Sequence, residues 1–151
     1  MRALDKGWHV GPIGAEDLGH RTIDQWGGPQ WAKTVILATA RTSDAIKEAM
    51  AARRFYAVRF PDTRLSFTVD GEIMGSQITR SPGEALAVHA EASTDATIEL
   101  VTSAGAVLAS GSSPLDTAVT TSADQRYYFV RARAANGAVI AYSSPVWVAA
   151  T

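Results

Sequence analysis

The chain has 151 residues, of which 46% are hydrophobic and 19% are charged, a balance typical of globular proteins. It contains no cysteine, which excludes disulfides, thiolate nucleophiles and cysteine-based metal sites. A net charge of −1 gives no overall basic footprint for nucleic acid. No apolar run approaches the roughly 18 residues of a membrane span, so neither a nucleic acid nor a membrane is expected as a partner.

The charge is distributed unevenly along the chain. Up to Arg64, ten Lys and Arg residues stand against seven Asp and Glu, a net charge of +3, whereas the remaining residues carry −4. A change of sign at one point indicates two units. We therefore place a boundary near residues 59–63 and predict two domains, residues 1–60 and residues 61–151.

Residues 1–60 predict a partial α/β layer. Its expected elements are the last turn of a helix, a short strand, a buried strand, a helix and a second short strand: Arg2–Lys6, Trp8–Val10, Lys33–Ala40, Ser43–Arg54 and Phe55–Val58. Thr42 or Ser43 is the expected N-cap of the main helix. Its apolar residues Ile46, Ala49 and Met50 are expected to pack on the buried strand. Apolar area left exposed there favours a homodimer.

Residues 61–151 change to a period of two, which predicts an antiparallel β-sandwich. Asp70-Gly71 and Asn136-Gly137 are strong hairpin turn signals. The apolar members of the alternating runs are expected to be buried: Leu65, Phe67, Val69, Leu86, Val88, Ile98, Leu100 and Val130. The fold class predicted for the whole chain is thus α+β, a partial α/β layer followed by a β-sandwich.

The glycine-rich loop between residues 11 and 20 carries the densest set of potential metal ligands. Glu16, Asp17 and His20 have the carboxylate and imidazole groups that bind Zn²⁺, Mn²⁺ or Fe²⁺. Because zinc needs at least three protein ligands, Asp17 and His20 alone do not complete a site, and His9 is a candidate third. The alternative is a solvated loop with acidic residues at a turn.

Other candidate groups each have a structural alternative. Tyr127, Tyr128, Phe129 and Trp147 form either packing on the sheet faces or a sugar-binding platform. A basic group either binds phosphate or lies on a solvated helix face: Arg41, Lys47, Arg53, Arg54 and Arg59. No recognised catalytic motif is present, and no catalytic residue is assigned.

Several segments, taken in order, resemble a known family. They are Gly7–Asp17 with His20, Thr34–Ala40, Arg53–Ala57, Leu65–Ser76 and Ser143–Val148. This order is similar to the C-terminal part of the CehA/McbA-like metallohydrolases, a branch of the PHP (polymerase and histidinol phosphatase) hydrolases. The resemblance implies that residues 1–60 are the end of a PHP-like barrel and that the remainder of that domain is a partner.

The resemblance also implies a function. Such an enzyme holds divalent metals that activate water to attack a phosphoester or a related ester, amide or carbamate. Asp17 and His20 match its last ligand motif, with one more residue between them than the family's usual spacing. The H-x-H pair that opens the family's ligand set is absent. The chain alone is therefore expected to hold no metal and to be inactive.

Three functional hypotheses follow. The first is the C-terminal segment of a metal-dependent hydrolase or phosphoesterase, and the second is a stand-alone β-sandwich module that binds a partner without catalysis. The third, a small complete metalloenzyme, suffers from the shortage of ligands.

Overall fold

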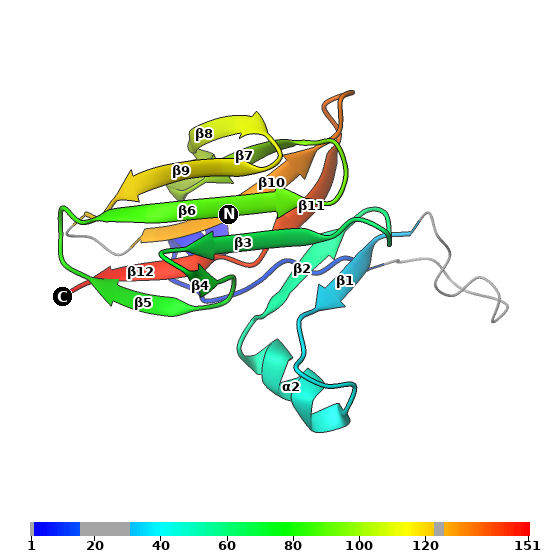
Figure 1. Ribbon diagram of the computed structural model, residues 1–151. Coiled ribbons are helices and arrows are strands. Elements are labelled where there is room, and N and C mark those ends of the chain that lie inside the picture. The colour runs from blue at the N-terminus through cyan, green and yellow to red at the C-terminus, as the bar shows by residue number, and fades with distance from the viewer. Residues whose placement is uncertain (1, 16–30, 123–125) are drawn as a thin grey trace, which may run out of the picture.

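The computed structural model describes residues 2–15, 31–122 and 126–151. In these ranges two sheets pack face to face as a β-sandwich (Figure 1). The large sheet contains β1 (Lys33–Ile36), β2 (Phe55–Val58), β11 (Val139–Ser143), β10 (Arg126–Arg133), β12 (Val146–Ala150) and β5 (Gln77–Arg80) in spatial order, with β7 (Thr97–Val101) and β8 (Val107–Ser112) attached through β10. The small sheet has the order β4 (Glu72–Ile73), β3 (Leu65–Val69), β6 (Ala85–Ala92), β9 (Leu115–Thr120).

The core lies between the sheets, as the period of two predicts. Strand side chains alternate between the two faces of a sheet, so Leu65, Phe67 and Val69 of β3 point to the same side. All eight residues expected to be buried are at most 3% exposed, which confirms that prediction. Both hairpin signals are also confirmed. Asp70 and Gly71 have φ of 53° and 79° at the turn between β3 and β4, and residues 136–137 join β10 to β11.

The prediction of a partial α/β layer that ends a PHP-like barrel is wrong. β1 and β2 pair antiparallel, with Lys33 opposite Val58, and β2 pairs antiparallel with β11 of the sandwich. In the described ranges these strands extend the large sheet, and no barrel portion accompanies them. Eighteen residues separate β1 from β2, which is long enough for a parallel crossover, so the sequence pattern did not reveal the reversal of direction. The predicted domain division at residue 60 stays a prediction.

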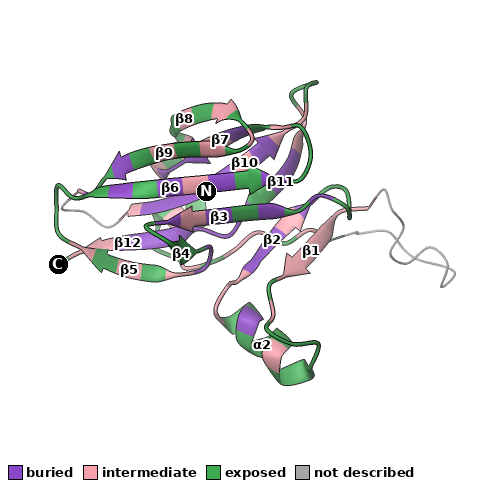
Figure 2. Cartoon of the chain, in the orientation of Figure 1, coloured by how far each residue is buried: buried purple, intermediate pink, exposed green. Residues whose placement is uncertain are grey.

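Helix α2 (Ser43–Ala51) lies at the end of β1 and β2 instead of covering a sheet (Figure 1). Thr42 is its N-cap, and the Thr42 hydroxyl accepts a hydrogen bond from the Ala45 amide. Ala49 is fully buried, but Ile46 and Met50 are 37% and 52% exposed, so the apolar face of the helix is only partly covered. Figure 2 shows that buried residues are concentrated in the sheets, whereas most of helix α2 is exposed or half-buried.

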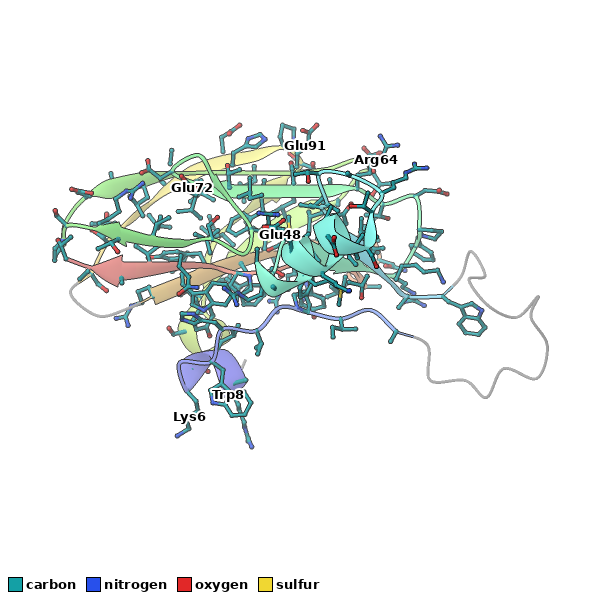
Figure 3. The ribbon with its side chains drawn as sticks, turned by 90° about the horizontal axis from the view of Figure 1, so that it is seen from below. Lys6, Trp8, Glu48, Arg64, Glu72 and Glu91 are labelled. Atoms are coloured by element: carbon teal, nitrogen blue, oxygen red, sulfur yellow. The ribbon has the colours of Figure 1, made fainter. Side chains whose placement is uncertain are left out.

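The N-terminal residues cross the outer face of the large sheet, on the side away from the small sheet (Figure 3). They begin with α1 (Arg2–Asp5), the expected single turn, which Gly7 follows at φ 80°. The expected strand at Trp8–Val10 does not form. We call residues 2–15 the strap. Neither α1 nor α2 is long and apolar enough to cross a membrane, and the described residues contain no other α-helix.

Candidate functional site

The metal ligands expected from the sequence are only partly visible. Glu16, Asp17 and His20 lie outside the described residues. His9 lies in the strap, where its ring contacts the Trp147 indole in a tilted arrangement, with 4.6 Å between ring centres and 34° between planes. Within residues 2–15, 31–122 and 126–151, no three His, Asp or Glu side chains are grouped closely enough to hold a metal ion. The metal site and the hydrolase function stay predictions.

Asp5 anchors the first part of the strap to the large sheet. Its Oδ1 atom accepts a hydrogen bond of 2.7 Å from the Tyr127 hydroxyl of β10 and one of 3.0 Å from the Ala104 amide. The hydrogen bond from Tyr127, and then that from Ala104, lower the pKa of Asp5. Burial and the hydrogen bond to Asp5 raise the pKa of Tyr127. Asp5 is thus held as a carboxylate with both donors in place.

Close backbone packing anchors the other end of the strap. The Gly14 amide donates to Thr34 Oγ1 at 3.0 Å, and the same hydroxyl donates to the Gly14 carbonyl at 3.1 Å. A Cβ atom on Gly14 would lie 2.3 Å from the Lys33 carbonyl oxygen, and one on Gly11 would lie 2.3 Å from Ser144 Oγ. Only glycine permits this approach of the strap to the sheet.

An aromatic face lies beneath the strap. Tyr127, Phe129 and Trp147 form a cluster with Val101, separate from the core between the sheets, and Leu4 of the strap packs on it. All three rings are at most 5% exposed, whereas Tyr128 points into the main core. These aromatics are therefore packing residues, and no ring face is free for a sugar.

Three hollows follow the strap along this face. The first, of about 490 Å³, lies beside Leu4, Asp5 and Gly7 and is bordered by Arg126 and Ser103. The second, of about 350 Å³, lies between Leu4 and Pro12, and the third, of about 210 Å³, lies beside Ile13 and Gly14. Leu4 borders both the first and the second hollow, and Tyr142 borders both the second and the third. Shared lining residues therefore link the three hollows, which together we call the strap groove.

Strand register fixes which side chains face the strap groove. Glu99, Arg131 and Tyr142 stand opposite one another on β7, β10 and β11, and the row continues through Ala57 to Thr34, which contacts the strap. Directly opposite residues of antiparallel strands point to the same face of a sheet. Tyr142, which borders two hollows, is 38% exposed at this face.

A group of three charges lies beside Tyr142 on the same face. The Glu99 carboxylate accepts a hydrogen bond from Arg131 Nε and another, of 2.9 Å, from Arg133 Nε. Burial alone would raise the pKa of Glu99, but the hydrogen bonds from the two arginines outweigh it and lower that pKa. Two guanidinium groups share one carboxylate, so the group carries one positive charge in excess.

Three arginines of the predicted basic group, Arg53, Arg54 and Arg59, do not gather at one site. Arg54 pairs with Glu48 of α2, whereas the guanidinium carbon of Arg53 lies 5.3 Å from the centre of the Trp147 ring. Arg59 lies over Phe60, with its guanidinium carbon 5.6 Å from the ring centre, and borders the third hollow. These three side chains point to three different neighbours.

Sequence reasoning did not find the strap groove. The i, i+2 spacing of Tyr127 and Phe129 does place both on one face of a strand, and this signal was available. No signal indicated that Asp5, more than a hundred residues earlier, would meet Tyr127. The groove depends on that long-range contact.

No family model and no curated protein matches the chain. Among solved structures, the chain is similar to the fibronectin(III)-like modules of CbhA from Clostridium thermocellum. The identity is 17%, the match covers 56% of this chain and 98% of that chain, and the TM-score is 0.45.

Proposed function

We propose that the chain is a β-sandwich binding module without catalysis of its own, and that it binds its partner along the strap groove. The observation that carries the proposal is the set of three hollows linked by Leu4 and Tyr142. Concave surfaces with a few polar groups among apolar ones are the usual binding sites of proteins.

Exposed apolar side chains beside the groove support the same proposal. Trp8 and Ile13 of the strap are 63% and 75% exposed, and Tyr142 stands between the second and third hollows. In Figure 3 the Trp8 side chain points away from the sandwich. Exposed apolar groups gathered beside a groove are typical of an interaction surface.

A peptide selection tests the proposal. Random peptides displayed on phage are selected on the immobilised chain and then tested on Tyr142→Ser and on Ile73→Ser. Ile73 is 41% exposed, close to the value for Tyr142, but lies on β4 of the small sheet. It is therefore a matched control for the loss of an exposed apolar side chain.

We expect peptides that bind the wild-type chain and Ile73→Ser but lose binding to Tyr142→Ser, with the circular dichroism of all three proteins alike. Failure to enrich any peptide, or equal binding to both variants, would show that the strap groove is not the binding surface.

A further inference from the structure

The charges that border the strap groove are mainly positive. Arg59 borders the third hollow, and Arg131 stands beside Tyr142 with Arg133 as its neighbour. Asp5 keeps its negative charge, because its donors Tyr127 and Ala104 are neutral, but Arg126 borders the same hollow. Glu99 is shared by two arginines. A ligand that approaches the groove therefore meets guanidinium groups in excess.

The second hollow, at the middle of the groove, is apolar. Leu4, Val10, Pro12, Phe129, Tyr142 and Pro145 border it, and none of its lining residues is charged. An apolar side chain can enter this hollow without removing an ion from water, which is the costly step when a charged site is closed. The middle of the groove therefore favours an apolar anchor.

The arrangement of the hollows indicates the form of the ligand. They follow the strap in chain order, beside Leu4 to Gly7, then Leu4 to Pro12, then Ile13 to Gly14. An extended peptide presents side chains to one surface at every second residue, so one peptide can reach neighbouring hollows. A compact ligand would occupy one hollow alone.

We infer that the strap groove binds an extended peptide whose apolar residues enter the second hollow and whose acidic residues lie toward Arg59 and the Arg131–Arg133 pair. The inference rests on the proposed binding function and specifies its partner. Complementary charge guides approach to such a surface and suppresses the wrong partner more than it adds to affinity.

The opposite side of the sandwich has the reverse charge. Glu72, Glu91 and Asp116 are exposed on the small sheet, and His89 pairs with Asp116 at 2.8 Å. Figure 3 shows Glu72 and Glu91 on the side of the molecule away from Lys6 and the strap. An acidic peptide is therefore repelled by the small sheet and directed to the strap groove.

Fluorescence anisotropy with three labelled peptides of equal length tests the inference. Each peptide alternates leucine with one other residue, which is glutamate, serine or lysine. We expect the glutamate peptide to bind about tenfold more tightly than the lysine peptide, with the serine peptide between them. The difference should shrink as salt is added, because exposed charges are screened.

Two arginine variants locate the effect. Arg59→Gln should reduce the preference for glutamate over serine by about threefold, the range expected of one exposed charge pair. Arg64→Gln is the control, because Arg64 is also exposed but lies on the side of Glu91 (Figure 3). It should leave the preference unchanged.

Each alternative result has a distinct meaning. Equal binding of the three peptides, lost in Tyr142→Ser, would overturn the charge preference and leave the proposed binding function intact. Tighter binding of the lysine peptide would also overturn the inference, and so would a failure of all three peptides to bind. If sedimentation shows a dimer that Tyr142→Ser dissociates and Ile73→Ser does not, the occupant is a second copy of the chain and the inference is wrong.

Discussion

The guanidinium carbon of Arg53 lies 5.3 Å from the centre of the Trp147 indole ring. Arg53 follows the C-cap of α2, and its amide bonds to the Met50 carbonyl while the next amide bonds to Ala49. This hydrogen-bond pattern is a Schellman motif, whose C′ residue is usually glycine. Arg53 occupies that position with φ of 57°. An arginine is therefore held in a glycine conformation while its side chain covers Trp147.

The first prediction separates these two effects by substitution. Arg53→Ala keeps a side chain in the left-handed conformation but loses the cation–π contact, so it should lower the free energy of unfolding by about 1 kcal/mol. Arg53→Gly also loses the contact but relieves the backbone, so it should be about 1 kcal/mol more stable than Arg53→Ala. Urea denaturation measures both, and equal stability of the two variants would contradict the strain at residue 53.

The second prediction concerns acid. The folded state lowers the pKa of Asp5 below 3.8, so its carboxylate stabilises the fold above that pH and loses this contribution as pH falls through the lowered pKa. Asp5→Asn should be less stable than the wild type at neutral pH. The gap between the two urea midpoints should close as the pH falls below about 4. A gap that stays constant with pH would show that Asp5 is not a strap anchor.

The third prediction concerns alkali. Burial, together with the hydrogen bond to Asp5, raises the pKa of Tyr127 above 10.0. The neutral phenol is therefore favoured in the folded state, and the stability that it gives is present below pH 10.0 and lost as the pH rises above it. Tyr127→Phe should show a smaller loss of stability above that pH. If Tyr127→Phe loses as much stability at high pH as the wild type, the loss is caused by other groups.

The fourth prediction concerns the fit of the strap. A Cβ atom at residue 14 would lie 2.3 Å from the backbone oxygen of Lys33, which cannot rotate away. Gly14→Ala should cost about 1–3 kcal/mol and should speed hydrogen exchange in the strap. Val10→Ala, a truncation in the same segment, is the control and should leave the exchange rates nearly unchanged. Equal exchange in both variants would mean that the strap does not depend on Gly14.

The fifth prediction concerns metal. Asp17 and His20 would supply only two ligands, and His9 lies against Trp147, so calorimetric titration with Zn²⁺ or Mn²⁺ should show weak binding or none. Asp17→Ala should leave the free energy of unfolding nearly unchanged. Tight stoichiometric binding that Asp17→Ala abolishes would restore the hypothesis of a small complete metalloenzyme.

Local patterns determined much of the sandwich. Alternation placed Phe67 and Val88 in the core because the period of a strand is two, and Asp70-Gly71 marked a hairpin because both residues accept positive φ. The main helix and its cap at Thr42 followed from the same local chemistry. Each of these features depends on residues close together in the chain.

Only the tertiary structure decided how these elements join. A strand, a helix and a strand fit either a parallel crossover or a reversal, and the choice came from pairing of β2 with β11, more than eighty residues away. The parallel pairing of β12 with β5 and the contact of Asp5 with Tyr127 are long-range in the same way. The sequence by itself determined the two hairpin turns and the buried face of strands such as β3 and β6, although it also predicted a strand at Trp8–Val10 that does not form. Long-range pairing decided the sheet order and the strap groove, because partners far apart in the chain leave no local pattern.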